Sequence, residues 1–215
     1  MAISYFSFKV NTIMKKLPIQ FYKRADVILI ARELIGKIIV TNVNGQITSG
    51  RIVETEAYIG LTDRASHSYG GKRTARNEHM YAEAGTVYVY ICYGMHHLFN
   101  VVCNKKDIPD AVLIRAVEPL SGIDIMLERS GKIRPGSSIT KGPGNAAKAL
   151  GISKNHSGIS VLQDQIYIAD DGYIVEQNCI GISSRIGIGN TGDAVLKPYR
   201  FYVKGNRFVS SYPNK

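Results

Sequence analysis

Two glutamates and a tyrosine alternate along the segment Arg51–Gly60, RIVETEAYIG. Alternation across residues 52–58 predicts a strand, so Glu54, Glu56 and Tyr58 should point to one face. A carboxylate beside an aromatic ring suits general-base chemistry on a flat, cationic ring. The same pattern also fits a solvated edge strand that happens to carry acids, and the spacing alone does not separate the two interpretations.

The distance between the two glutamates suggests a second chemistry. Side chains two positions apart in a strand are separated by about 6.6 Å, close to the carboxylate spacing of inverting glycosidases. However, the chain has no tryptophan to stack on sugars and is strongly basic. A polysaccharide hydrolase is therefore disfavoured, and cleavage of an N-glycosidic bond in nucleic acid fits the charge better.

Other catalytic patterns give little signal. His96 and His97 are adjacent, so in a strand or helix they cannot both face one metal, and His67 and His156 lack partners at ligand spacing. The chain contains no G-x-S-x-G motif, and no cysteine has a recognisable nucleophile context. We therefore expect neither a metal nor a cofactor.

The composition indicates an intracellular protein with a polyanionic partner. The chain has 27 Lys and Arg against 17 Asp and Glu, a formal net charge of +10, which favours DNA, RNA or an anionic membrane surface. Its three cysteines, Cys92, Cys103 and Cys179, are odd in number and unclustered, as expected in a reducing compartment. We expect a cytoplasmic protein, or a nuclear one in a eukaryote, and not a secreted one.

The N-terminal part of the sequence shows no recognisable membrane or export signal. The best apolar run, Val27–Val40, is interrupted by charged residues, so no segment reaches transmembrane length. Residues 1–14 lack a charged start followed by an uninterrupted apolar core, unlike a signal peptide. We interpret residues 1–16 as an N-terminal extension that we expect to be disordered, with Met14 as an alternative start.

Hydrophobic periodicity and turn residues predict an α/β (α+β) fold. Helices are predicted for the ranges 26–35, 123–129 and 145–150. Strands are predicted for the ranges 37–41, 47–58, 86–92, 98–104, 111–117, 166–169, 179–182 and 200–203. Asn44-Gly45 is typical of a type I′ hairpin turn. Because hairpin turns outnumber helical crossovers, we expect a single domain over 17–212 with a curved, largely antiparallel sheet and flanking helices.

Three loops stand out. Leu61–Tyr81 is polar and basic, and is long enough to be functional. Gly187–Gly192 fits the dinucleotide-binding pattern G-x-G-x-x-G, but Pro198 ends any following helix too early, so we expect a tight turn that approaches a ligand closely. Gly142–Gly144 precedes a predicted helix and is either a phosphate-binding turn or an ordinary loop.

Five blocks of sequence carry a resemblance to a known family. They are RIVETEAYIG at 51–60, HSYGGKRTARN at 67–77, GTVYVYICYGMHHLFN at 85–100, VLIRAVEPL at 112–120 and RIGIGNTGDAVLKPYRFY at 185–202. In content and order they resemble the alkyladenine, or mammalian-type 3-methyladenine, DNA glycosylase family, over about Leu17–Ser210. The resemblance implies a base-excision repair enzyme that flips alkylated or deaminated purines from duplex DNA. Such an enzyme hydrolyses the N-glycosidic bond with water and has no lyase activity.

The resemblance implies three residues for the chemistry itself. Glu56 matches the general base that deprotonates the attacking water. Arg115 matches an arginine that helps to hold this water, and the main-chain carbonyl of Ile186 matches a further water contact. We interpret Glu54 as a structural residue that forms a salt bridge with an arginine.

The same resemblance implies a pocket for the flipped base. Tyr58, His67 and Tyr90 match the walls that sandwich the base, and their aromatic faces would attract a cationic alkylated purine. Asn100 matches a residue that crowds the exocyclic amine of guanine. Hypoxanthine and ethenoadenine are further substrates that the family implies.

Contacts with the rest of the DNA are implied for two other groups. Tyr93 matches the wedge that fills the space left by the flipped base, with Met95 beside it. Lys72, Thr74 and Arg76 lie where the family contacts phosphates. The expected partner is double-stranded DNA containing damaged purines, bound by a monomer, with no membrane role.

The sequence departs from the family pattern outside the implied catalytic set. Leu61-Thr62 replaces the usual proline and acid after the glycine, Ala75 replaces a proline in the basic loop, and Asn145 replaces a lysine after the G-P-G turn. These changes suggest looser loops and put one phosphate contact in doubt. Two other classes remain open: a nucleic-acid-binding protein without catalysis, and a carbohydrate hydrolase that uses Glu54 and Glu56.

Overall fold

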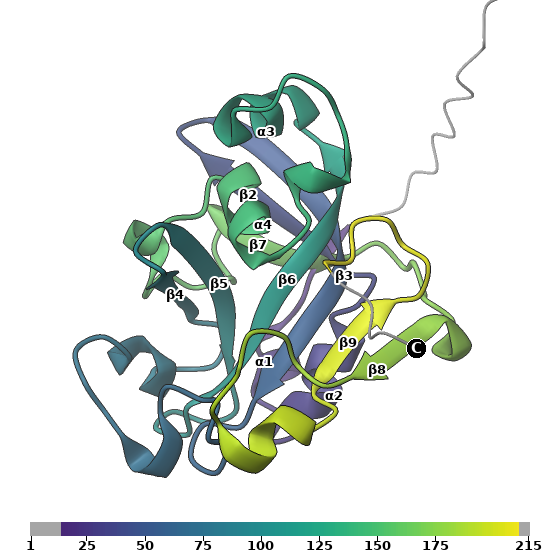
Figure 1. Ribbon diagram of the computed structural model, residues 1–215. Helices are drawn as coiled ribbons and strands as arrows, with labels where there is room; N and C mark the ends of the chain where they lie inside the picture. The colour runs from purple at the N-terminus through teal and green to yellow at the C-terminus, as the bar shows by residue number, and fades with distance from the viewer. Residues whose placement is uncertain (1–13, 211–215) are drawn as a thin grey trace, which may run out of the picture.

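The computed structural model describes residues 14–210, whose strands join into one nine-stranded sheet (Figure 1). The strands are β1 (Lys15–Lys16), β2 (Ile38–Val43), β3 (Gln46–Tyr58), β4 (Val87–Cys92), β5 (His96–Cys103), β6 (Asp110–Ser121), β7 (Ile166–Asp170), β8 (Ile180–Ser183) and β9 (Arg200–Val203). The α-helices are α1 (Ile19–Tyr22), α2 (Val27–Glu33), α3 (Ile123–Ser130) and α4 (Pro143–Ala149). Short 3₁₀ helices lie in the loops: η1 (Tyr69–Gly71), η2 (Glu78–Tyr81), η3 (Ser137–Ile139), η4 (Lys154–His156), η5 (Gln177–Cys179) and η6 (Gly192–Leu196).

Strands β3 and β6 form the axis of the sheet. Neighbouring strands run antiparallel, in the order β1-β7-β2-β3-β6-β5-β4. On its other edge β3 pairs with β2 as far as Arg51 and then, from Glu54 to Glu56, with β9, which carries β8. The long strand β3 therefore joins two parts of the sheet and has neighbours on both edges where the glutamates lie.

The pairing of β3 with β6 is irregular around these glutamates. The register shifts on both sides of Glu54, so that Val53 and Arg115 fall outside the regular ladder. Such bulges bend a strand and redirect its side chains, and they are common next to active sites. Beyond the bulge, Thr55 donates a hydrogen bond to the carbonyl of Ala31 in α2, whereas Glu54 and Glu56 face the opposite way.

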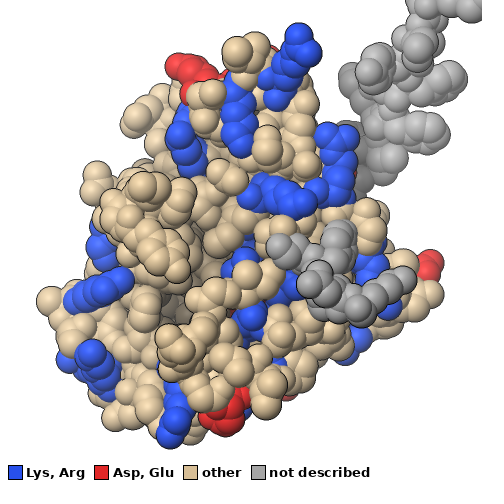
Figure 2. All heavy atoms as spheres, in the orientation of Figure 1, with Lys and Arg blue, Asp and Glu red and all other residues tan. Residues whose placement is uncertain are grey.

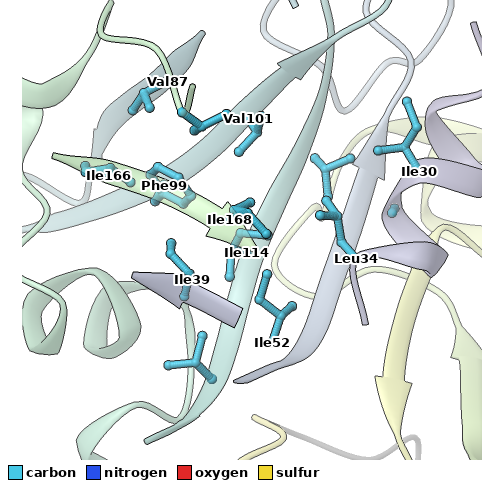
Figure 3. Close-up of a cluster of buried hydrophobic side chains, with 14 of the residues drawn as sticks. Ile30, Leu34, Ile39, Ile52, Val87, Phe99, Val101, Ile114, Ile166 and Ile168 are labelled. Atoms are coloured by element: carbon cyan, nitrogen blue, oxygen red, sulfur yellow. The ribbon is translucent and has the colours of Figure 1, made fainter. Parts of the chain in front are cut away.

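The main hydrophobic core extends from strands β4, β5 and β7 across β6 and β3 to helix α2 (Figure 3). Ile30 from α2 and Leu34, the C-cap of this helix, belong to one cluster of buried side chains with Ile52 from β3 and Ile114 from β6. Each of these side chains is at most 2% exposed. Burying them stabilises the fold by about 1.5–3 kcal/mol per side chain, and this core fixes the strands that carry the polar site.

The predicted helices are confirmed with shifted ends. Helix α2 begins after Asp26, whose carboxylate accepts a hydrogen bond from the amide of Leu29 at 2.9 Å, and the chain then turns at Gly36 with φ +88°. Helix α4 begins at Pro143, two residues before the predicted start, because proline is well suited to the first turn of a helix.

The predicted antiparallel sheet and single domain are also confirmed. Asn44 and Gly45 both have positive φ, as a type I′ turn requires. Strand β6 runs four residues past its predicted end at Val117, and β1, which was not predicted, adds Lys15 and Lys16 to the edge of β7. The rest of the expected N-terminal extension, residues 1–13, lies outside the described residues, as do residues 211–215. No described helix has the length and apolar character needed to cross a bilayer.

The end of β3 provides a test of backbone packing. A Cβ atom added to Gly60 would lie 2.3 Å from the carbonyl oxygen of Pro109, and the amide of Gly60 donates to Asp110 at 2.8 Å. We predict that Gly60→Ala lowers the free energy of unfolding by about 1–3 kcal/mol, measured by urea denaturation. Gly136→Ala is the control, because Gly136 has extended φ and no atom within 4 Å of its added Cβ. Equal stability of the two variants would contradict the prediction.

Candidate active site

A cavity of about 610 Å³ lies between the β4–β5 hairpin, the end of β3, the start of α4 and the loop after β8. Figure 2 shows a hollow on the same face as Figure 1, with lysine and arginine side chains spread around it and few acidic ones. This distribution of charge favours a polyanionic partner on this face.

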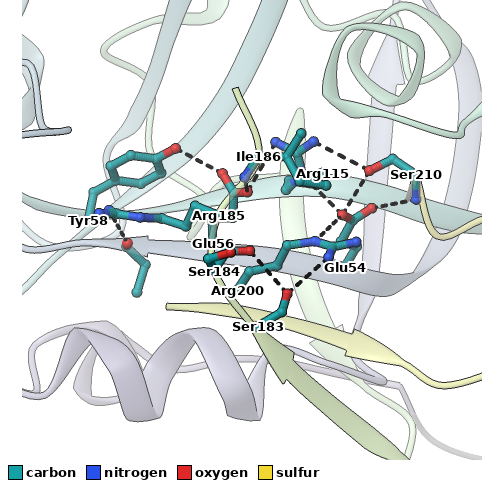
Figure 4. A network of polar contacts seen from close by, with 11 residues as sticks. Glu54, Glu56, Tyr58, Arg115, Ser183, Ser184, Arg185, Ile186, Arg200 and Ser210 are labelled. Atoms are coloured by element: carbon teal, nitrogen blue, oxygen red, sulfur yellow. Dashed lines mark hydrogen bonds and ion pairs between the residues drawn. The ribbon is translucent and has the colours of Figure 1, made fainter. Parts of the chain in front are cut away.

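Glu56 lies behind the wall of this cavity and is held by three donors (Figure 4). Its Oε2 accepts a hydrogen bond from the hydroxyl of Tyr58 at 2.8 Å, and its Oε1 accepts one from the backbone amide of Ile186 at 2.8 Å. Arg115 Nη1 lies 3.3 Å from the same Oε1. Glu56 is completely buried, but all three partners line the cavity.

Arg115 joins the two glutamates of β3. Its Nε donates to Glu54 at 3.1 Å while Nη1 contacts Glu56. Burial opposes the charge of Arg115, but the two carboxylates outweigh this effect and raise the pKa of Arg115 above its usual value. The guanidinium therefore remains a fixed cation between two buried anions.

Glu54 is fully buried and lies in a second cluster beside the first. Its Oε1 accepts hydrogen bonds from Arg200 Nε at 2.7 Å and from the hydroxyl of Ser210 at 2.8 Å, and its Oε2 accepts one from the amide of Ser210. The expected salt bridge between Glu54 and an arginine is thus confirmed. The alternative of a solvated edge face is wrong, because Glu54 and Glu56 are both 0% exposed on an interior strand.

Aromatic side chains form the walls of the cavity. His67 Nδ1 lies 2.8 Å from the hydroxyl of Tyr88, and the ring of His67 meets that of Tyr90 edge-on with centroids 4.5 Å apart. Tyr88 and Tyr90 are tilted neighbours on β4 with centroids 5.8 Å apart. Together with Tyr58 these rings surround a space that suits a flat aromatic ligand.

The aromatic side chains of the walls are uncharged near neutral pH. Burial, reinforced by Glu56, raises the pKa of Tyr58 well above its usual value, and burial raises the pKa of Tyr88 to about 12. Burial also lowers the pKa of His67, and the nearby cations of Arg76 and Lys72 lower it further. A positively charged ligand would therefore meet uncharged aromatic faces.

Asn100 lies on β5 beside these rings and lines the cavity. It is 4% exposed, and its Nδ2 donates to the carbonyls of Tyr88 at 3.1 Å and Leu98 at 3.3 Å. These bonds to two neighbouring strands fix the side chain in one orientation. The structure therefore places Asn100 where it would limit the shape of a ligand.

The β4–β5 hairpin projects two apolar side chains into solvent. Tyr93 is 86% exposed and Met95 is 72% exposed. Tyr93 has φ +49° and Gly94 has φ +73°, so the chain reverses sharply at the tip. Tyr93 also lines the mouth of the cavity. A core role for this tyrosine is excluded by its exposure.

The basic loop is organised by a buried residue, Asn77. Its Nδ2 donates to the carbonyls of Lys72 and His67, and its Oδ1 accepts from the amide of Thr74 at 2.7 Å. Lys72, Thr74 and Arg76 are exposed, and Arg76 also lines the cavity. One side chain thus links Lys72 and Thr74 to the cavity residue His67.

Sequence reasoning missed four residues of this site, namely Tyr88, Asp63, Arg185 and Arg200. Tyr88 shares the inward face of β4 with Tyr90, so strict alternation would have found it. Arg200 neutralises Glu54, and Asp63 pairs with Arg185 behind Tyr58. These pairs join segments more than a hundred residues apart, and nothing in local spacing signals such partners.

The arrangement defines a class of protein. A neutral aromatic pocket suits a flat base, a buried carboxylate and arginine lie directly behind it, and exposed cations border it. Among residues 14–210, no group of three His, Cys, Asp or Glu side chains is placed to bind a metal ion. Fold and site together are those of an enzyme that acts on a nucleic-acid base.

Comparison with known proteins identifies the family. A model of the methylpurine-DNA glycosylase family matches residues 20–207. A protein of Clostridium perfringens strain SM101 is 48% identical over 198 residues, which cover 88% of this chain and 96% of the relative. A protein of Bacillus subtilis strain 168 is 47% identical over 197 residues, which cover 90% of this chain and 96% of that protein. Both relatives bear the name "Putative 3-methyladenine DNA glycosylase".

The chain therefore belongs to the methylpurine-DNA glycosylase family. It is a DNA glycosylase, a hydrolase of N-glycosyl bonds that acts in base-excision DNA repair. Membership confirms the resemblance seen in the sequence blocks, and it decides against a binding protein without catalysis and against a carbohydrate hydrolase.

The cluster around Glu54 predicts a large effect on stability. Glu54→Gln leaves Arg115 and Arg200 without their shared buried anion, and breaking such a pair costs about 3–5 kcal/mol. Glu78→Gln, which removes an exposed partner of Arg73, should cost at most about 1 kcal/mol. Urea denaturation of both variants measures the difference, and similar losses would show that the Glu54 cluster does not stabilise the fold.

Proposed function

We propose that this enzyme removes alkylated purines of the 3-methyladenine type from duplex DNA, with Glu56 as the general base that activates water. The observation that carries the proposal is the contact of Glu56 with Arg115 and the amide of Ile186, directly behind the aromatic pocket. We propose water, and not a lysine amine, as the nucleophile, because these groups can orient water. The reaction would then be hydrolysis without lyase activity.

The pocket supports recognition of a charged base. Alkylation at N3 or N7 gives a purine a positive charge, and each aromatic face attracts such a charge by about 0.5–2 kcal/mol. The lowered pKa of His67 supports this binding, because a neutral imidazole does not repel the cation. Fixed Asn100 would disfavour guanine by crowding its exocyclic amine.

The chemical step follows from the same charges. Water adds to the sugar carbon as the purine leaves with the electrons of the glycosidic bond, and the proton from water passes to Glu56. A cationic purine leaves as a neutral molecule and needs no acid. Because Glu56 is buried and Tyr58 and Arg115 line the cavity in front of it, water must reach it past one of these two side chains.

The proposal includes two neutral lesions, hypoxanthine and ethenoadenine. They lack the built-in charge and so should be released more slowly than alkylated purines. The test is base release from duplexes that each carry one lesion, under enzyme excess. If no alkylated purine is released, the proposed function is overturned. Release of uracil alone would show that the enzyme acts on a different class of lesion.

We further propose that the protein acts as a monomer wherever the cell keeps its DNA, in the bacterial cytoplasm or a eukaryotic nucleus. The net charge of +10 and the exposed cations of one face support binding of a single duplex. Sedimentation of the protein with and without duplex tests the stoichiometry, and a stable dimer that binds two duplexes would contradict it.

The first functional prediction concerns Glu56. Replacement by Gln keeps the size of the side chain but removes its ability to accept a proton from water. Single-turnover excision should therefore fall by about 10²–10⁴-fold, while a gel shift on the same lesioned DNA should show retained binding. The matched change Glu54→Gln should reduce excision far less once the protein is folded. The opposite order of losses would mean that the base is Glu54.

The second functional prediction concerns Tyr93 as the residue that fills the space left by the flipped base. Flipping a base costs a few kcal/mol of unstacking, which an inserted ring offsets. We predict that Tyr93→Ala impairs excision from a paired duplex more than from a lesion opposite a gap. Tyr173→Ala is the control, since Tyr173 is exposed but does not line the cavity. Equal loss on both substrates would assign Tyr93 to folding or chemistry.

The third concerns the phosphate contacts of Lys72, Thr74 and Arg76. Each contact should add roughly one unit to the slope of log affinity against log salt. Lys72→Ala should lower the slope for undamaged duplex without changing lesion preference. Lys23→Ala, which removes an exposed lysine near Glu83, should leave it unchanged. An affinity that does not depend on salt would refute the assignment.

A further inference from the structure

A buried ion pair lies behind the pocket and takes no part in the chemistry described above. Asp63 Oδ1 accepts a hydrogen bond from Arg185 Nη2 at 2.8 Å, and Asp63 Oδ2 accepts one from Arg185 Nη1. The side chains are 1% and 0% exposed. Neither residue lines the cavity, so neither would touch a bound base.

The pair contacts three of the segments that build the site. Arg185 Nη1 donates to the carbonyl of Ala57 at 2.9 Å, and its guanidinium lies 4.6 Å from the centre of the Tyr58 ring. Asp63 Oδ1 accepts a hydrogen bond from the amide of Ala65, and the backbone carbonyl of Asp63 accepts one from the amide of Ser66, at the start of the loop that carries His67. Figure 4 shows Arg185 reaching toward Tyr58, beside Ile186.

The third segment is the loop after β8. Arg185 directly precedes Ile186, whose amide donates to Glu56. A shift of Arg185 would therefore move both the tyrosine whose hydroxyl donates to Glu56 and the backbone amide that donates to its carboxylate. Loss of the pair would therefore weaken two hydrogen bonds to Glu56 at once, those from Tyr58 and from the amide of Ile186. It would not remove any side chain that lines the cavity.

We propose that Asp63 and Arg185 are positioning residues for catalysis, which hold Tyr58 and the amide of Ile186 in place around Glu56. This inference rests on the proposed role of Glu56 as general base. Excision depends on this placement, because a misplacement of about 1 Å near a reacting group can reduce a rate by about 10²-fold.

Stability alone does not account for the pair. Removing two charges from water is costly, and well-packed apolar side chains often serve the fold equally well. Arg185 Nε, moreover, is buried without a hydrogen-bond partner among the described residues. The planar guanidinium makes several contacts in fixed directions at once: two hydrogen bonds to a carboxylate, one to a carbonyl, and a flat face against a ring.

The chain contains a matched control at Arg51. Arg51 binds both carboxylate oxygens of Asp171 at 3.1 and 2.7 Å, donates to the carbonyl of Gly36 at 2.7 Å and lies 4.2 Å from the centre of the Tyr173 ring. This pair repeats the contacts of Arg185, but none of its members lines the cavity. Arg51→Lys thus removes the same kind of contacts elsewhere in the fold.

The experiment compares Arg185→Lys with Arg51→Lys and Glu56→Gln on duplex DNA carrying one alkylated purine. Lysine keeps the charge but cannot make the forked contacts. We expect Arg185→Lys to lower single-turnover excision by about 10²-fold, while affinity for the lesioned duplex changes by less than about tenfold. Arg51→Lys should leave both quantities near those of the parent protein.

The comparison of excision with binding separates positioning from a general loss of structure. A partly unfolded protein would lose both together, whereas looser contacts around Glu56 in Arg185→Lys should lower excision and leave binding nearly unchanged. If Arg185→Lys melts below the assay temperature, Asp63→Asn takes its place, with the same expected loss of excision and retained binding.

Two outcomes would overturn the inference: excision equal to that of Arg51→Lys, or parallel loss of binding and excision. If Glu56→Gln retains excision, the role of Glu56 as general base is wrong, which is a separate result from failure of the positioning role. A loss in Glu56→Gln with none in Arg185→Lys rejects the positioning role alone.

Discussion

The site depends on one buried arginine shared between two buried carboxylates. Arg115 contacts Glu54 and Glu56 within the same interior, where isolated charges would be very unfavourable. Arg200 supplies a second cation to Glu54, so the cluster contains two positive and two negative side chains. These opposite charges compensate one another behind the aromatic pocket.

The backbone that supports this cluster is equally constrained. Along one edge, strand β3 pairs first with β2 and then with β9, and along its other edge it pairs with β6. Next to the bulge, Glu54 contacts both Arg200 from β9 and Arg115 from β6, whereas Glu56 contacts Arg115 and the amide of Ile186. A regular strand would keep one constant pattern of cross-strand neighbours, so the irregularity is what allows two acids on the same face to have different surroundings.

Sequence patterns predicted the elements of the fold well, because alternation, turn residues and helix caps are local signals. They placed Glu54, Glu56 and Tyr58 on one face, and the structure brings Arg115 and Ile186 to them. Local patterns did not reveal that both acids are buried, since burial depends on β9 and on the segment ending at Ser210. The resemblance supplied the roles of the pocket residues, which remain predictions, and alternation alone never pointed to the pair behind Tyr58.

The contacts of Glu54 with Arg200 and Ser210 have a consequence for synthesis of the chain. Residue 54 leaves the ribosome roughly 150 positions before its partners, so its carboxylate must stay hydrated until the last strand can be added. Strand β9 pairs with β3 at Glu54–Glu56, so this part of the sheet can close only when nearly the whole chain is available.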